Sequence, residues 1–215
     1  IPEGMEDRFE HLPLECSHLY LAIERKLAAV ICVEDPLREE AADAVRELKE
    51  AGITKVVMMT GDSERTAAAI AKRVGVDEYY SEVLPEDKAS FVEKEKELGH
   101  KVIMIGDGIN DSLALSSASV GIAISDGAAI AREIADVTIS ADNLHEIVTL
   151  KRLSTALMKR IHNNYRTIIG INGGLIALGV TGIIMPTTSA LLHNMSTLTI
   201  SLRSMRNLLP KEEEA

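Results

Sequence analysis

Cysteine is scarce in this chain of 215 residues, which has only Cys16 and Cys32. The two are too far apart to form a Cys-x-x-Cys pair, so the sequence predicts neither a disulfide framework nor a zinc site. Cys32 lies within the apolar run 27–33, and we expect it to be a small core residue. A reducing cytosolic compartment is consistent with this composition.

Basic side chains are outnumbered, since 23 Lys and Arg against 33 Asp and Glu give a net charge of −10. Residues 1–146 hold 30 acidic and 15 basic side chains, whereas residues 147–215 hold 3 acidic and 8 basic ones. Nucleic-acid binding requires Lys and Arg to neutralise phosphates, so the acidic first part argues against nucleic acid as a partner. The first thirty residues are acidic and mixed, which does not match a signal peptide.

Charge is absent from Thr167 to Leu202, a run of 36 residues that Pro186 interrupts near its middle. Two helices of about 18 residues would each rise about 27 Å, close to the ~30 Å hydrocarbon thickness of a bilayer. Basic residues flank the run on both sides, so we predict a transmembrane hairpin with both ends cytoplasmic. A buried hairpin of a soluble protein is the alternative, favoured by the glycines and polar residues within the run.

Short runs rich in Val and Ile alternate with amphipathic segments through the first part of the chain. We predict strands at 27–33, 54–59, 101–105, 120–124 and 137–139, and helices at 36–51, 63–74, 86–98, 110–117 and 128–134. This alternation predicts an α/β fold with a doubly wound parallel sheet, followed by the helical hairpin.

Acidic residues follow two of the predicted strands, in Thr60-Gly61-Asp62 and in Gly106-Asp-Gly-Ile-Asn-Asp111. Parallel strands place such residues at the edge of the sheet where α/β proteins bind ligands. Two carboxylates on one Gly-flexed loop, Asp107 and Asp111, suit Mg²⁺ and leave coordination positions for phosphate oxygens. Thr60, the backbone N–H groups after it, and Lys88 would hold a phosphoryl group.

These residues also have purely structural interpretations. Asp62 and Asp111 could cap helices that begin at the residue after each of them. Lys88 could be a solvated surface lysine, and Asn110 a turn residue. Asp107 lies between two glycines where no helix needs a cap, which favours metal ligation.

Thr60-Gly61-Asp62, Pro85-Glu-Asp-Lys88 and Gly106-Asp-Gly-Ile-Asn-Asp111, in this order and spacing, resemble the phosphorylation domain of P-type ATPases. That domain belongs to the haloacid dehalogenase-like phosphotransferases, and the resemblance runs from about Leu27 to the C-terminus. It implies ATP and Mg²⁺ as cofactors, with Mg²⁺ held by Asp107 and Asp111. The implied catalytic residues are Thr60, Gly61, Asp62, Lys88, Asp107, Asn110 and Asp111, and the implied cofactor-binding residues are Asp62, Asp107, Gly108 and Asn110.

The family's nucleophile, the Asp of Asp-Lys-Thr-Gly-Thr, does not occur among these residues. In the family that segment precedes a nucleotide-binding insert, so we expect this chain to be the C-terminal part of a longer pump, inactive by itself. The implied division is the tail of the insert at 1–26, the phosphorylation domain at 27–146, a cytoplasmic basic linker helix at 147–166, two transmembrane helices at 167–207 and an acidic tail at 208–215.

The C-terminal hairpin resembles the last two membrane helices of the heavy-metal (type 1B) P-type ATPases. His193-Asn-Met-Ser-Thr197 is similar to the His-Glu-Gly-Gly-Thr of one divalent-metal subgroup, although Glu and Gly are replaced. The resemblance implies a transported-ion site formed by His193, Asn172 and Ser196. Counted from Pro186, Asn172 is about 21 Å deep and His193 about 10 Å, so we expect them not to share one ion unless the helix breaks at Gly173-Gly174.

Imidazole, hydroxyl and amide ligands suit divalent ions of the Zn, Cd, Co and Mn class better than Cu⁺. The resemblance implies ATP-driven export of such a heavy-metal cation by a multi-pass membrane pump with a cytoplasmic phosphorylation domain. Its partners would be the transition-metal ion, the lipid bilayer and the remainder of the same pump chain. The alternative is a non-catalytic, membrane-anchored Mg²⁺-binding domain of the same fold. A soluble phosphatase would need an Asp-x-Asp loop, which the sequence lacks.

Overall fold

The computed structural model describes residues 17–23, 26–33, 36–106, 110–124, 133–139 and 143–208. The chain divides into two compact units, Ile1–Val148 and Thr149–Ala215.

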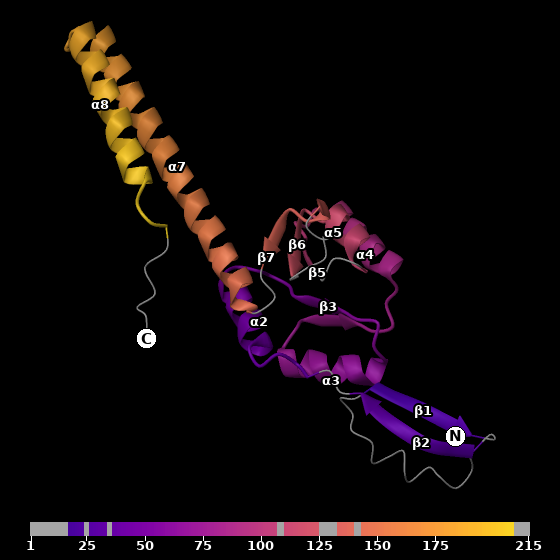
Figure 1. The fold of residues 1–215 in the computed structure, drawn as a ribbon. Coiled ribbons are helices and arrows are strands. Elements are labelled where there is room, and N and C mark those ends of the chain that lie inside the picture. The colour runs from indigo at the N-terminus through magenta and orange to yellow at the C-terminus, as the bar shows by residue number, and fades with distance from the viewer. Residues whose placement is uncertain are drawn as a thin grey trace. The chain divides into compact units, whose positions relative to one another are not determined.

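The first unit is built from parallel strands that alternate with helices, as the sequence predicts (Figure 1). Its parallel strands form two separate pieces, β3-β4 and β5-β6-β7, with β6 in the middle of the second piece. The strands are β3 (Val57–Met59), β4 (Glu78–Tyr80), β5 (Ile103–Gly106), β6 (Val120–Ile124) and β7 (Val137–Ile139), and the helices are α2 (Ala41–Glu50), α3 (Glu64–Val74), α4 (Pro85–Glu97) and α5 (Ser112–Ser117).

Local sequence signals explain where the helices begin and end. Ser63 caps α3 by accepting a hydrogen bond from the backbone N–H of Thr66, and Gly75 ends the helix in the left-handed conformation at φ 79°. Pro85 begins α4, where a missing N–H costs nothing. The predicted helix at 36–51 is shorter than expected, because a turn in which Arg38 accepts from the N–H of Ala41 comes first.

A small apolar core joins the two parallel pieces. Val92 from α4, Met104 from β5 and Leu115 from α5 are buried together, and Met59 at the end of β3 packs against them. This cluster brings the carboxyl end of β3 close to β5 and its neighbours. The residues that follow these strands are those singled out by the sequence.

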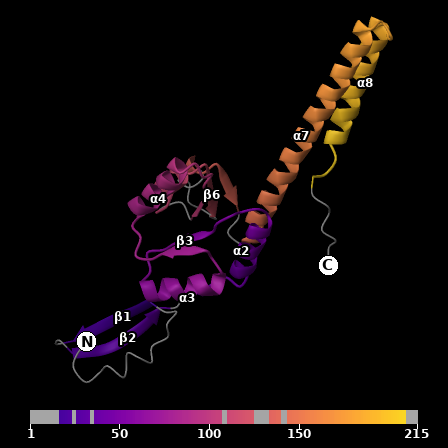
Figure 2. The ribbon, with the colours of Figure 1, turned by 180° about the vertical axis from the view of Figure 1, so that it is seen from behind.

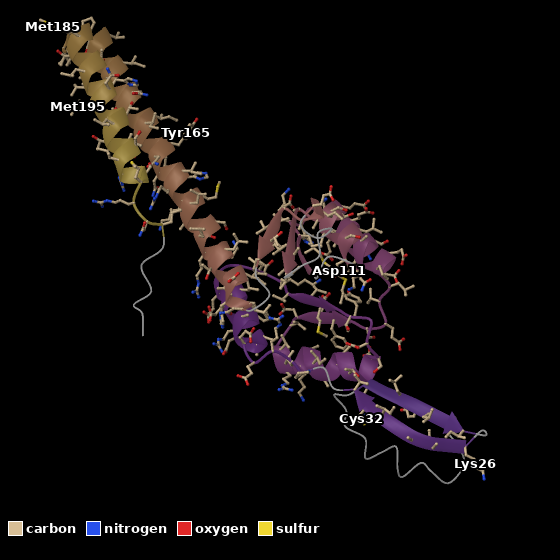
Figure 3. The ribbon with its side chains drawn as sticks, viewed as in Figure 1. Lys26, Cys32, Asp111, Tyr165, Met185 and Met195 are labelled. Atoms are coloured by element: carbon tan, nitrogen blue, oxygen red, sulfur yellow. The ribbon has the colours of Figure 1, made fainter. Side chains whose placement is uncertain are left out.

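Residues 27–33 form a strand as predicted, but the prediction that this strand belongs to the parallel sheet is wrong. These residues form most of β2 (Lys26–Val33), which pairs antiparallel with β1 (Ser17–Ile23) in a two-stranded ribbon instead of entering a parallel sheet (Figure 1). Cys32 is therefore exposed and is not a core residue (Figure 3). The strand β4 was not predicted, and most of the helix predicted at 128–134 lies outside the described residues.

Two long helices dominate the C-terminal part. α7 runs from His145 to Val180 and α8 from Pro186 to Ser204. They lie side by side and antiparallel in both views (Figures 1 and 2), with Met185 in the turn that joins them (Figure 3). The predicted helical hairpin is thus present as a pair of helices. Judged by length and mean hydropathy, none of the helices in the described ranges qualifies as a membrane span.

Candidate phosphoryl-transfer site

The residues after β3 form a tight turn that is held by its own side chains. The Thr60 hydroxyl donates to the Asp62 carboxylate at 2.7 Å, and the Asp62 N–H donates back to the same hydroxyl oxygen at 3.1 Å. The Thr60 backbone donates to Tyr80 and accepts from Val83, each at 3.0 Å, which ties the turn to β4 and the chain beyond it. Asp62 does not cap α3, because Ser63 does so. Its carboxylate is instead engaged by Thr60.

Lys88 and Asp111 are in direct contact, although the motif resemblance implies separate roles for them. Lys88 lies in the first turns of α4, and its Nζ donates to Oδ1 of Asp111 at 2.8 Å. The two side chains are only 16% and 11% exposed, which excludes the interpretation of Lys88 as a solvated surface lysine. Asp111 makes no side-chain capping bond to α5, and its Oδ1 accepts from the lysine instead. Figure 3 shows Asp111 within the first unit.

Gly106 makes room for this carboxylate. A Cβ at position 106 would lie 2.8 Å from both Cβ and Cγ of Asp111, closer than non-bonded carbons approach. The end of β5 is therefore in contact with the Asp111 side chain, and only a glycine leaves enough space. The first glycine of the motif is thus required by packing, independently of any ligand.

Glu64 fastens the start of α3 to the end of β4, a link that the sequence did not reveal. Its carboxylate accepts from the hydroxyls of Ser81 and Tyr79, the latter at 2.8 Å. These two hydrogen bonds hold the pKa of Glu64 below its usual range, and the one from Tyr79 raises the pKa of that phenol. In the sequence, only the hydroxyl-bearing residues Tyr79, Tyr80 and Ser81 after Asp77 hint at this contact, and they do not indicate which acceptor they bind.

The proposed Mg²⁺ ligands are only partly within the described ranges. Asp107 and Gly108 lie outside them, and Asn110 is exposed. Within those ranges no group of three His, Cys, Asp or Glu side chains converges in a way that could hold a metal ion. The Asp111 carboxylate has the chemistry that Mg²⁺ prefers, so it fits a site completed by a further carboxylate from the same loop.

Candidate ion site in the hairpin

The structure brings Asn172 and His193 together. Nδ1 of His193 lies 2.9 Å from Oδ1 of Asn172, across the pair of helices. The expectation that they lie at different depths is therefore wrong, because the turn between the helices begins after Val180 and not at Pro186. Since Oδ1 can only accept, Nδ1 of His193 carries the proton. That tautomer leaves the lone pair of Nε2 available to a ligand.

Ser196 is half-buried on α8 but makes no hydrogen bond to the side chains of Asn172 or His193 among the described contacts. Its hydroxyl donates to the backbone carbonyl of His193 at 2.7 Å, and the hydroxyl of Thr197 donates to the same carbonyl at 3.1 Å. Both hydroxyls are thus engaged within α8. The site that the described contacts define consists of one imidazole, oriented by one amide.

Comparison with known proteins

Several known proteins are similar to this chain in sequence or in fold. The family model for haloacid dehalogenase-like hydrolases matches residues 3–119. The zinc-exporting P-type ATPase of Mycobacterium marinum is 36% identical over 189 residues, 87% of this chain and 26% of that protein. Copper-transporting ATPase 2 of Rhizobium meliloti is 44% identical over 176 residues, 82% of this chain and 21% of that protein. The chain thus spans about a quarter of the length of these curated relatives.

A solved structure extends the similarity to almost the whole chain. The crystal structure of a zinc-transporting PIB-type ATPase in the E2.Pi state matches with a TM-score of 0.83 at 29% sequence identity, covering 98% of this chain and 34% of that one. The similarity therefore includes the helical hairpin as well as the parallel strands. Because the matched family model covers more than half of the chain, this protein belongs to the haloacid dehalogenase-like hydrolases.

Proposed function

We propose that this chain is the C-terminal part of a pump that uses ATP to export a heavy-metal cation across a membrane. The observation that carries the proposal is the shielded Lys88–Asp111 pair beside the glycine that ends β5. A lysine held in this way places a fixed positive charge next to the motif loop, where a phosphoryl group would gain most from it. The sequence and structural similarity to zinc, manganese and copper P-type ATPases supports the same function.

The reaction would proceed through a covalent phosphoenzyme. A carboxylate oxygen of an Asp outside this chain attacks the γ-phosphorus of ATP, and the bond from that phosphorus to the bridging oxygen breaks as ADP leaves. Water then cleaves the aspartyl phosphate and releases inorganic phosphate. Thr60 and Lys88 would stabilise the charge on the transferring group, and Asp111 would hold Lys88 in position. Mg²⁺, held by Asp107 and Asp111, would neutralise phosphate charge.

The nucleophile would come from the remainder of the same pump chain. Among the described residues, β3 and β5 each pair with one neighbour only, β4 and β6 respectively. Met59 and Met104, which lie on these two strands, pack in one core cluster. A further strand between β3 and β5 would join the two pieces into one sheet. Its carboxyl end would then lie between the Thr60 turn and the Asp111 loop.

The hairpin would cross the membrane. This proposal rests on how side chains are distributed around the helix pair and not on average hydropathy. Large aliphatic residues face outward along both helices, and Met195 lies on the outer side of α8 (Figure 3). A soluble hairpin would place aliphatic residues between its helices and polar residues outside, whereas here many half-buried positions are polar. These positions are Asn164, Thr167, Asn172, Ser189, Ser196 and Ser204.

The exported ion would bind His193 through Nε2, with Asn172 fixing the tautomer and ring orientation from the other nitrogen. Such a ligand suits Zn²⁺ and related divalent ions. The relatives include zinc, manganese and copper transporters and so do not identify the ion, which has to be determined by experiment. His193→Ala in the full-length pump should abolish activation of ATP hydrolysis by the metal, while phosphorylation from inorganic phosphate continues. Unchanged activation would exclude His193 as a ligand.

Phosphoenzyme formation tests the catalytic proposal. The full-length protein should incorporate phosphate from labelled ATP into an acid-stable, hydroxylamine-sensitive form. Lys88→Ala should reduce the rate of incorporation by about 100-fold, as is typical for loss of a charge-stabilising group. Lys94→Ala, an exposed position on the same helix, is the matched control. A full-length protein that binds Mg²⁺ but incorporates no phosphate would favour the non-catalytic alternative.

Labelling tests the membrane topology. A cysteine introduced by Thr188→Cys, next to the turn, should react with an impermeant maleimide from outside the cell. One introduced by Lys159→Cys should react only after permeabilisation. The reverse pattern would overturn the orientation, and reaction of both from outside would overturn the transmembrane hairpin.

A further inference from the structure

Arg160 closes the open end of the hairpin, opposite the turn at Met185. Its guanidinium donates to the carbonyl of Ser204 at 3.0 Å, to that of Asn207 at 2.8 Å and to that of Arg206. One turn further along α7, the Asn164 amide donates to the Ser204 hydroxyl at 2.7 Å. Ser204 is the last residue of α8, and Arg206 and Asn207 follow it, so one side chain from α7 binds carbonyls at and just beyond the end of α8.

These contacts agree in register with the distant Asn172–His193 contact. Arg160 lies 12 residues before Asn172 on α7, and Ser204, whose carbonyl it binds, lies 11 residues after His193 on α8. At 1.5 Å per residue these separations are about 18 Å and about 16.5 Å, so one antiparallel alignment satisfies both ends of the pair. A slip of α8 by one helical turn, about 5.4 Å, would break all of these hydrogen bonds at once.

We propose that Arg160 and Asn164 are positioning residues that lock the register of α8 against α7 and thereby hold His193 opposite Asn172. The lock is needed because the other contacts along the pair are less specific. Its half-buried aliphatic positions, such as Ile171, Leu175 and Ile200, can pack in more than one register. Directional bonds to three carbonyls from one planar guanidinium select a single register. The consequence for an exported ion rests on the function proposed above, whereas the register itself does not.

Cross-linking of the full-length protein tests the register, with its native cysteines replaced by serine. Ile171→Cys with Ser196→Cys places two thiols at one level in the observed alignment, whereas Thr167→Cys with Ser196→Cys would meet only after a slip of about one turn. Arg160→Ala combined with Asn164→Ala should lower the in-register yield about tenfold and raise the slipped yield, because several charge-assisted bonds are lost. Arg166→Ala, an exposed arginine on the same helix, should change neither yield.

Two further measurements separate this inference from the proposed function. Arg160→Lys retains the charge and can reach one carbonyl, so an intermediate yield is expected, and this variant also serves if the alanine variant does not fold. Zn²⁺ affinity, measured by competition with a chromogenic chelator, should fall in parallel with the in-register yield. Unchanged cross-linking in the double variant would overturn the lock. A register change in a protein that does not bind Zn²⁺ would support the lock and contradict the ion site.

Discussion

Removal of Lys88 provides the sharpest test of the site. Its Nζ lies 2.8 Å from Asp111, and the two side chains are 16% and 11% exposed. Lys88→Met would keep the aliphatic stem but leave a shielded carboxylate without its partner. Breaking a fully buried pair costs about 3–5 kcal/mol, and this pair retains some contact with water, so we expect a loss of about 2–4 kcal/mol of unfolding free energy.

A double-mutant cycle separates the pair from its surroundings. Asp111→Asn is nearly isosteric and should by itself destabilise the first unit by a similar amount. The double variant, Lys88→Met with Asp111→Asn, should lose less than the two single losses together, with a coupling of about 1–3 kcal/mol. The coupling is expected because each single change leaves one unpaired charge, which the double change removes.

Urea unfolding, monitored by far-ultraviolet circular dichroism, measures these losses of unfolding free energy. The helices of the chain supply the signal, so no probe has to be added. Lys94→Met is the matched control, because Lys94 is exposed on the same helix and should change the free energy of unfolding by no more than about 0.5 kcal/mol. Losses that simply add, or a Lys88→Met variant as stable as the Lys94→Met variant, would refute the argument that the pair is held away from water.

Further expectations concern a glycine and an exposed carboxylate. Gly106→Ala should lower the free energy of unfolding by about 1–3 kcal/mol, since the new Cβ would lie 2.8 Å from Asp111. Gly174→Ala on α7, where a new Cβ would have no neighbour within 4 Å, is the control and should not destabilise the protein in this way. Equal thermal unfolding of the two variants would contradict the packing argument. Hydrogen bonds from Lys49 and from the N–H of Val56 lower the pKa of Asp77 from 3.8, so its stabilisation should be present above that pH and lost as pH falls through the lower folded-state pKa. Asp77→Asn should therefore be less stable than the parent at pH 7 and equal to it in strong acid, and a difference that persists in acid would exclude this cause.

The sequence predicted β3, β5, β6 and β7 but not β4, because the pattern of apolar residues and the capping residues agree at the first four. Ser63 and Gly75 mark both ends of α3, and the short apolar strands at 57–59 and 103–106 are each followed by a polar residue, Thr60 or Asp107. It failed at 27–33 because an apolar run does not tell a core strand from a ribbon strand. Both have the same period, and only the partner strand distinguishes them.

The pairing of Lys88 with Asp111 could not be predicted in the same way. The two residues are 23 positions apart, and their contact depends on how α4 packs beside the end of β5. The motif resemblance singled out both residues but assigned one to phosphate and the other to metal, which does not imply a contact between them. The direct contact means that a change at either side chain alters the electrostatic surroundings of the other.

The level of Asn172 and His193 depends on where the chain turns. Counting residues back from Pro186 assigns the whole segment before it to helix, which places Asn172 too deep. In the structure α7 ends at Val180, so Asn172 lies eight residues before one helix end and His193 seven after the other. At 1.5 Å per residue both lie about 10–12 Å from the turn, which is why their side chains meet. Since α7 is continuous to Val180, no break at Gly173-Gly174 is needed to bring the two side chains together.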